Sequence, residues 1–401
     1  MKKSIVLYLQ VHQPYRLKPY AVFDIANDHS YFNDSSDSDI NNRRVFERVC
    51  DKSYRPMNAL LEKLLYEHEE FKVTLSLTGT FIEQARKWAP DVLDSFKQLV
   101  ATGKVELLAE TYHHSLAYFY SPTEFERDVA LHQQVIYQEF GVLPSVFRNT
   151  ELAYNNGLAQ WAEHHGYKGI LAEGWDKVLG WRSPNYVYQP VGTESIRLLL
   201  KNYRLSDDIA FRFGNISWKE WPLTAHKYAQ WLSNEDDQLI NLFMDYETFG
   251  EHQWQDTGIF SFFDHFVSIW LKTEDHNFMT VSEAIASSEP KGTIDMPEVV
   301  TWADTERDLS AWNGNDLQKE ALKYVYALEK DVLRTHDTGL IEDWRKLLTS
   351  DLTYYFSTKS SHDGSVHNYF SPYSSPYQAF LSFMNVVRDI RWRIREYERN
   401  R

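Results

Sequence analysis

The sequence predicts an α/β fold with a parallel sheet, followed by a helical domain. The first observation is a set of short apolar runs, each with the length of a buried strand. These runs occur at 5–11, 73–78, 105–109, 145–148, 167–172, 195–200 and 238–244. The second observation is that helical segments separate the early runs, as in α/β domains with a parallel sheet. The third is a change of pattern near residue 300.

The helical segments show apolar residues at three- and four-residue spacing. They cover 57–70, 81–103 and 125–141. Gly103 and Gly141 lie where two of these helices should end, just before the next strand.

After about residue 300 the sequence consists of long amphipathic segments with few strand signals. They cover 315–334, 339–356 and 376–398. We therefore expect a catalytic domain at 1–300 and a helical domain at 301–401 that completes the substrate cleft. The polar tract 27–42 predicts a surface loop, because it cannot bury enough apolar area to order itself.

Composition excludes several classes of protein. The 401 residues carry a net charge of −15, which is unfavourable for binding a phosphate backbone. Cys50 is the only cysteine, so neither an intramolecular disulfide nor a cysteine zinc cluster can form. No apolar stretch approaches the roughly 20 residues of a membrane span, and the opening MKKSIVLYLQ lacks a cleavage site. We expect a cytoplasmic protein that binds neither nucleic acid nor membrane, and no residue pattern indicates an oligomeric state.

Aromatic residues are unusually frequent. Phe, Trp and Tyr make up 15% of the chain, with 13 Trp and 25 Tyr. Flat rings with a polar edge suit stacking against sugar rings. The alternative is that these side chains fill the core.

Polar and charged residues follow four of the predicted strands. They are His12 in VHQPY, Glu110, His113 and His114 in ETYHHS, Glu151 in RNTELAYN, and Asp245 in DYETFGEH. In a parallel barrel the active site forms at the carboxyl ends of the strands, so we expect these side chains to converge. Taken alone, His12 could be a hydrogen-bonded core histidine, and Glu151 an acid at a helix N-terminus that Asn149 or Thr150 caps.

The stretch MDYETFGEHQW at 244–254 crowds carboxylates behind a buried strand. Burial beside Glu247 or Glu251 would raise the pKa of Asp245, so that it could act as a general acid. A solvated acidic loop is the alternative. Two carboxyls facing each other across a cleft are what glycoside hydrolysis needs, and Glu151 and Asp245, 94 residues apart, are the candidate pair.

Five segments together resemble the conserved regions of glycoside hydrolase family 57, which contains α-amylases, 4-α-glucanotransferases, amylopullulanases, branching enzymes and α-galactosidases. In order they are VHQPY (11–15), GKVELLAETYHHSL (103–116), FRNTELAYN (147–155), MDYETFGEH (244–252) and TWADTERDLSAWNGN (301–315). Each motif alone is weak, but five in order are specific.

The resemblance implies an incomplete (β/α)7 barrel followed by a helical domain, and retaining chemistry on α-1,4-glucans without cofactor or metal. It implies that Glu151 is the nucleophile and Asp245 the general acid/base. The residues expected to contact substrate are His12, Gln13, Glu110, His113, Arg148, Trp254, Trp302 and Asp304.

Two positions depart from the family pattern. Arg148 stands three residues before Glu151, where members often have Trp, and Met244 precedes Asp245, where glucanotransferases often have His. Both departures favour an α-amylase-like enzyme over a 4-α-glucanotransferase.

Two further alternatives remain open. A metal-dependent hydrolase, such as a polysaccharide deacetylase or an α-mannosidase, could use His12, His113 and His114 with an Asp as ligands. However, no familiar ligand spacing is present, and neighbouring histidines on a strand would point to opposite faces. An inactive glucan-binding protein is the other alternative, and the retained carboxyl pair argues against it.

Overall fold

The computed structural model describes residues 2–32 and 40–400. The chain forms two compact units. The first contains Met1–His12, Glu47–Glu110 and His132–Trp302, and the second contains Gln13–Phe46, Thr111–Leu131 and Ala303–Arg401. The domain boundary near residue 300 stays a prediction. The second unit contains two early segments besides the C-terminal helices.

All seven expected strands form in the first unit. They are β1 (Lys3–Val11), β2 (Val73–Leu77), β3 (Val105–Leu107), β4 (Val146–Phe147), β5 (Gly169–Glu173), β7 (Arg197–Lys201) and β8 (Leu239–Asp245). Three short strands were not predicted, namely β6 (Val187–Pro190), β9 (His276–Phe278) and β10 (Thr293–Ile294). Residues in β2 and β5 are buried throughout, as expected for strands covered on both faces.

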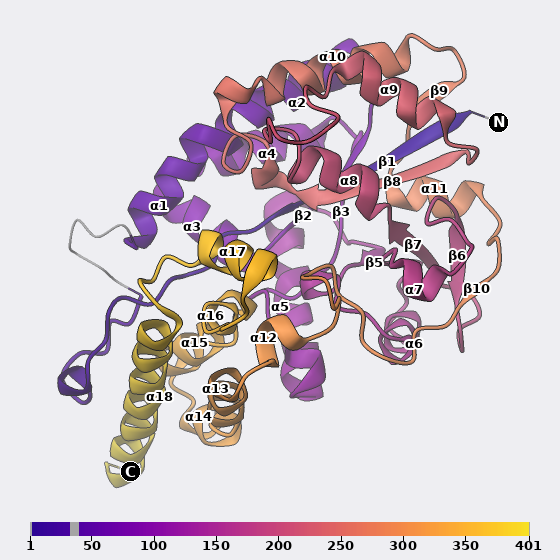
Figure 1. The fold of residues 1–401 in the computed structure, drawn as a ribbon. Helices are drawn as coiled ribbons and strands as arrows, with labels where there is room; N and C mark the ends of the chain where they lie inside the picture. Colours follow the sequence, from indigo (N-terminus) through magenta and orange to yellow (C-terminus); the bar gives the residue numbers. More distant parts are fainter. Residues whose placement is uncertain (1, 33–39, 401) are drawn as a thin grey trace. The chain divides into compact units, whose positions relative to one another are not determined.

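The seven strands follow one another around an incomplete barrel. One sheet has the parallel order β3-β2-β1-β8, with β9 also on β1 (Figure 1), and the other has the order β10-β6-β7-β5-β4. A parallel bridge between Ala109 and Phe147 joins β3 to β4. Beyond β7, the Asn202 N–H donates to the Asn241 carbonyl of β8 at 2.9 Å, although β7 and β8 belong to different sheets. The predicted incomplete (β/α)7 barrel is therefore confirmed.

Helices separate the strands of the first unit. They are α2 (Arg55–Glu67), α3 (Gly79–Trp88), α4 (Pro90–Ala101), α6 (Asn156–His164), α7 (Asp176–Leu179), α8 (Tyr203–Ala210), α9 (Ala225–Asn234), α10 (Ile259–Leu271) and α11 (Val281–Ser287). Two more, α1 (Asn42–Val49) and α5 (Pro122–Phe140), have residues in both units.

The helix expected over 81–103 is in fact two helices. Pro90 is the first residue of α4, and Ala89 leaves the helical conformation before it. Proline lacks an N–H and disfavours a helical residue in front of it, so the helix ends there. The expected stop signals are confirmed, since Gly103 and Gly141 adopt left-handed φ values of 74° and 68°.

The C-terminal part of the second unit is helical, as predicted. Its helices are α12 (Ser310–Asn313), α13 (Asp316–Tyr326), α14 (Glu329–Thr335), α15 (Thr338–Lys346), α16 (Ser350–Tyr354), α17 (Ser361–Phe370) and α18 (Pro376–Arg399), and α18 is the long yellow helix that runs to the C-terminus in Figure 1. Fully buried Trp344 and Phe383 lie in the core of this unit. No helix within residues 2–32 and 40–400 is both long and apolar enough to cross a lipid bilayer.

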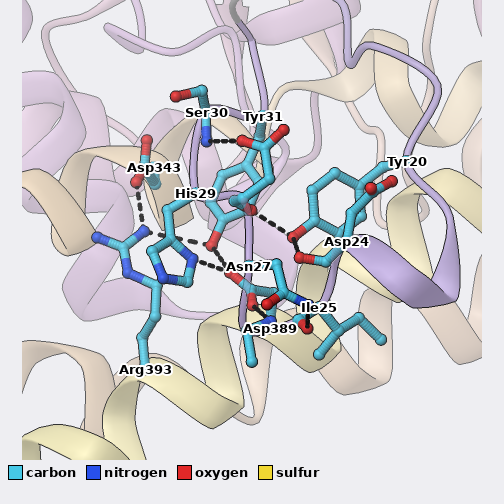
Figure 2. A network of polar contacts seen from close by, with 12 residues as sticks. Tyr20, Asp24, Ile25, Asn27, His29, Ser30, Tyr31, Asp343, Asp389 and Arg393 are labelled. Atoms are coloured by element: carbon cyan, nitrogen blue, oxygen red, sulfur yellow. Dashed lines mark hydrogen bonds and ion pairs between the residues drawn. The ribbon is translucent and has the colours of Figure 1, made fainter.

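The tract 27–42, expected to be a surface loop, is partly anchored. Residues 33–39 of this tract lie outside the described residues. Buried Asp389 of α18 accepts a hydrogen bond from the Ala26 N–H at 2.6 Å. It also accepts hydrogen bonds from His29 Nδ1 at 2.7 Å and from the Tyr31 hydroxyl (Figure 2). Arg393 adds bonds to the Tyr31 hydroxyl and to Asp343. Residues 27–32 therefore form a loop, as predicted, with Asn27, His29 and Ser30 exposed. The buried Asp389 carboxylate anchors this loop through His29 and Tyr31.

We predict that Asp389→Asn destabilises the protein by about 2–3 kcal/mol, because it weakens several hydrogen bonds to one buried charge. Urea unfolding measures this change. Asp331→Asn on α14 is the matched control, since its carboxylate is half exposed and pairs with Arg334. Equal losses in the two variants would contradict the prediction.

Candidate active site

Several polar and charged residues of the first unit lie at or just after the carboxyl ends of the barrel strands. His12 follows β1, Thr78 follows β2, and Glu110 lies three residues beyond β3. Arg148 and Glu151 follow β4, while Glu173, Lys201 and Asp245 are the last residues of β5, β7 and β8. Parallel strands place these ends at the same edge of the barrel, which is where such folds carry their active sites.

Glu151 has an unusual backbone conformation. It lies in a short 3-10 turn (Thr150–Leu152), with φ 59° and ψ 24°, and Leu152 also has a positive φ of 50°. A non-glycine residue in this region costs about 1–3 kcal/mol and is typical of functional sites. The alternative that Glu151 begins a helix is wrong, because α6 starts later and is capped by Asn155.

Trp302 holds Glu151 at two points. Its indole Nε1–H donates to Glu151 Oε2 at 2.8 Å, and its backbone N–H donates to the Glu151 carbonyl at 3.2 Å. The first bond fixes one carboxylate oxygen and the second fixes the strained backbone. Trp302 therefore orients the predicted nucleophile.

Arg148, which departs from the family pattern, is fully buried. Its Nη2 donates to Gln10 Oε1 at 2.6 Å, and its Nη1 lies 3.6 Å from Glu110 Oε2, which is also fully buried. The guanidinium carbon lies 5.1 Å from the centre of the Trp302 ring. Arg148 thus connects the residues that follow β3 and β4 with β1.

Glu173 and Lys201 belong to the same edge, and the sequence analysis missed both. Lys201 Nζ lies 3.9 Å from Glu173 Oε2, 3.1 Å from Asp207 Oδ1 and 5.3 Å from the centre of the Trp302 ring. A side chain on Gly174 would place its Cβ 2.2 Å from the Lys201 carbonyl, so glycine is needed for the close approach of β5 and β7. A charged residue directly after an apolar run, as in GILAE and RLLLK, was the available signal.

Asp245 faces the inside of the barrel. It is the register partner of Gln10 on β1, and paired residues on neighbouring strands point to the same side. Gln10 is bonded to Arg148, which follows β4, a strand that is not a neighbour of β1. Burial raises the pKa of the Tyr8 phenol well above its usual range, and the nearby charges of Arg148, Glu110 and Asp245 also act on it. Gln10 and Arg148 thus connect Glu110 with the side of β8 on which Asp245 lies. His12, Glu151 and Asp245 follow or end strands of the first unit, whereas His113 and His114 belong to the second unit, and the convergence of all six residues stays a prediction.

Glu247, rather than Asp245, is the carboxyl that is deeply buried. It is 5% exposed and accepts hydrogen bonds from the Tyr54 hydroxyl and from the His12 N–H at 3.2 Å. Burial and the charge of Asp245 raise the pKa of Glu247 to about 8. The raised pKa expected for Asp245 stays a prediction.

Glu251, His252 and Trp254 of the stretch MDYETFGEHQW each have different surroundings. Glu251 pairs with Arg48 at 3.6 Å and Lys52 at 3.5 Å, so the cations that the stretch lacks come from an earlier segment. Burial lowers the pKa of His252 to about 4, which leaves its ring neutral near pH 7. Trp254 is 57% exposed, with Lys52 Nζ over its ring at 5.2 Å.

His12 and the candidates in the second unit have polar partners of their own. His12 Nδ1 lies 3.0 Å from Thr78 Oγ1. Gln13 accepts from Arg16 Nη2 at 3.4 Å. Buried Asp304, with a left-handed φ of 56°, binds Lys359 at 2.7 Å and His367 at 2.9 Å. Their contacts with substrate stay predictions.

His113 is a buried imidazolium. Its Nδ1 lies 2.7 Å from Asp128 and its Nε2 lies 3.2 Å from Glu342. Burial lowers the pKa of His113, but the two carboxylates outweigh burial and raise the pKa to about 10. Both ring nitrogens are thus engaged by carboxylates, so His113 would have to give up one of these hydrogen bonds to bind a metal ion. His113 and His114 also lie after β3 rather than on it, so the expectation that they point to opposite faces of a strand does not apply.

Known proteins resemble the chain over most of its length. A protein of Methanocaldococcus jannaschii named "Putative alpha-amylase" is 44% identical over 403 residues, covering 98% of this chain and 85% of that protein. A 4-alpha-glucanotransferase of Thermococcus litoralis is 23% identical over 362 residues, covering 80% of this chain and 46% of the other. This chain therefore spans about half of that glucanotransferase.

Solved structures share the fold at low sequence identity. The branching enzyme of Pyrococcus horikoshii superposes with a TM-score of 0.69 at 14% identity, covering 92% of this chain and 88% of that one. The α-amylase AmyC of Thermotoga maritima gives a TM-score of 0.62 at 13% identity, covering 99% of this chain and 96% of that one.

The model of the family described as "Glycosyl hydrolase family 57" matches residues 6–297. This range includes β1 to β10 except for the first three residues of β1, and it includes both Glu151 and Asp245. Together with the 44% identical relative, this match shows that the chain belongs to glycosyl hydrolase family 57.

Proposed function

We propose that this protein is a retaining glycoside hydrolase that acts on α-1,4-glucans, with Glu151 as nucleophile and Asp245 as general acid/base. The observation that carries the proposal is the fixation of Glu151. Its backbone is held in a left-handed conformation, and one carboxylate oxygen accepts the Trp302 indole N–H. Such a costly arrangement is expected for a group that must attack in one direction. Asp245, which ends β8 and faces the barrel interior, supplies the second carboxyl.

The two carboxyls divide the reaction into two steps. In the first, Glu151 attacks C1 of the sugar, the bond from C1 to the glycosidic oxygen breaks, and Asp245 gives its proton to that oxygen. A glycosyl ester of Glu151 results. In the second, ionised Asp245 takes a proton from water while the water oxygen attacks C1, which releases Glu151 and restores the proton on Asp245.

Hydrolysis and transfer differ only in the acceptor of the second step. If a sugar hydroxyl replaces water, the same residues produce a longer glucan, as in a 4-α-glucanotransferase. Relatives of both kinds are similar to this chain. The 44% identical relative and the presence of Arg148 and Met244 support hydrolysis. The cytoplasmic location also stays a prediction.

We predict that the protein converts maltoheptaose into shorter sugars with new reducing ends, and that Glu151→Gln loses about 10⁴-fold or more of this activity. Chromatography of the products measures both. Glu126→Gln, at an exposed position of α5, is the control and should keep full activity. A ladder of longer products would replace hydrolysis by transfer, and unchanged maltoheptaose would contradict the proposal.

The roles of the two carboxyls are separable with azide and an aryl α-maltoside that has a good leaving group. In Glu151→Ala, azide should attack C1 directly and give the β-glycosyl azide. In Asp245→Ala, azide should attack the glycosyl ester of Glu151 and give the α-glycosyl azide. NMR of the products distinguishes the two anomers. Exchanged anomers would reverse the assignment.

The buried carboxyl beside Asp245 predicts a pH dependence of stability. Because the pKa of Glu247 is raised from 4.5 to about 8, the folded protein holds one proton more than the unfolded chain between these values. The free energy of unfolding should therefore fall as the pH rises through this window, by at most ~1.4 kcal/mol per pH unit. In Glu247→Gln this pH-dependent contribution to the free energy of unfolding disappears, while the Gln amide oxygen can still accept a hydrogen bond from the Tyr54 hydroxyl. Urea unfolding at pH 5, 7 and 8.5 tests this, and parallel pH curves for the two proteins would refute it.

A further inference from the structure

The Trp302 side chain contacts one carboxylate, that of Glu151, and two cations, Arg148 and Lys201. Its indole N–H donates to Glu151 Oε2 at 2.8 Å. The guanidinium carbon of Arg148 and the ammonium of Lys201 lie 5.1 and 5.3 Å from its ring centre. Cations within about 6 Å of an aromatic ring are attracted by its π electrons. One indole therefore connects the predicted nucleophile to both cations.

Both cations are held at the ring by carboxylates of their own. Arg148 lies 3.6 Å from Glu110, and both side chains are fully buried. Lys201, whose side chain is 6% exposed, lies 3.9 Å from buried Glu173 and 3.1 Å from Asp207. Removing two cations from water is costly, so their placement at the ring calls for an explanation beyond stability.

We infer that Arg148 and Lys201 are positioning residues for the nucleophile Glu151, acting through the Trp302 indole. A cation on the ring withdraws π electron density, which makes the indole N–H a stronger donor to the Glu151 carboxylate. The same positive charge stabilises the ionised carboxylate, which is the form that attacks C1. This inference rests on the proposed function. It gives Arg148 a role other than the substrate contact expected from the sequence.

Several elements of the first unit carry charged or titratable groups that interact with Arg148, Lys201 or Tyr8. The positive groups are Arg148 after β4 and Lys201 at the end of β7. The negative or titratable groups are Tyr8 of β1, Glu110 after β3, Glu173 of β5, Asp207 of α8 and Asp245 of β8. Replacing one of these charges without changing the ring should shift the ionisation of Glu151 in a direction set by the sign of that charge.

The test is the dependence of kcat/KM on pH for maltoheptaose hydrolysis. In Lys201→Met the loss of a positive charge should raise the pKa of Glu151. The acidic limb of the kcat/KM profile should therefore move to higher pH by roughly half to one unit. At the optimum, kcat should fall about tenfold while KM changes less than threefold, since no substrate contact is removed. Lys201→Arg should restore the wild-type profile.

Lys227→Met is the matched control. Lys227 Nζ lies 5.3 Å from the centre of the Trp231 ring and 2.8 Å from Glu220, so it makes the same kind of contacts away from Glu151. It should leave the pH profile unchanged. Equal shifts in the two variants would overturn the inference, because loss of any lysine would then have the same effect.

Asp207→Asn provides a second test with the opposite sign, and it remains informative if Lys201→Met does not fold. The Asp207 side chain is 18% exposed, and its loss should strengthen the positive field of Lys201. The acidic limb should then move to lower pH. An unchanged limb, or one that moves to higher pH, would overturn the inference.

A double-mutant cycle tests the route through the indole. Trp302→Phe keeps a ring and removes the N–H, so Lys201→Met should shift the acidic limb less in this background than in the wild type. Equal shifts would overturn the role of the indole. If the wild-type protein leaves maltoheptaose unchanged, the proposed function fails. If it is active but its acidic limb does not respond to these variants, the inference alone fails.

Discussion

The hydrogen bond from the Trp302 indole to the Glu151 carboxylate is the contact on which the rest of the site depends. It links the last residue of the first unit to the turn after β4, and a backbone bond between the same two residues supports it. Both bonds are made to Glu151 in its left-handed conformation. Arg148 and Lys201 lie at the same ring, and each also contacts a carboxylate of its own.

The barrel supplies the surroundings that this contact needs. Parallel strands bring Glu110, Glu173, Lys201 and Asp245 to one edge, and apolar residues on each strand bury the side chains beneath them. Buried charges are paired, as with Arg148 and Glu110, and the deeply buried carboxyl Glu247 has a pKa raised toward its neutral form.

Much of the fold followed from the sequence, because short apolar runs locate the main strands and their carboxyl ends mark the edge where the candidate residues lie. All seven main strands follow from these runs, whereas the charged residues that end β5 and β7, Glu173 and Lys201, were missed. The short β6, β9 and β10 were missed, because two to four residues give little periodicity. Contacts between residues far apart in the sequence could not be predicted for another reason. Neither the pairing of Trp302 with Glu151, 151 residues apart, nor that of Asp389 with Tyr31 leaves a local signal. Pro90 could have divided the helix 81–103, but the amphipathic pattern continues across it.

The most direct test of the central claim is to trap the glycosyl ester. An α-maltosyl fluoride with a second fluorine at C5 forms the ester readily, because fluoride leaves easily, and releases it slowly, because the second fluorine disfavours positive charge at C1. Peptide mapping by mass spectrometry after incubation should find one maltosyl group on the peptide that contains Glu151. A label on the peptide of Asp245 and Glu247 instead, or turnover with no labelled peptide, would contradict the assignment of Glu151 as nucleophile.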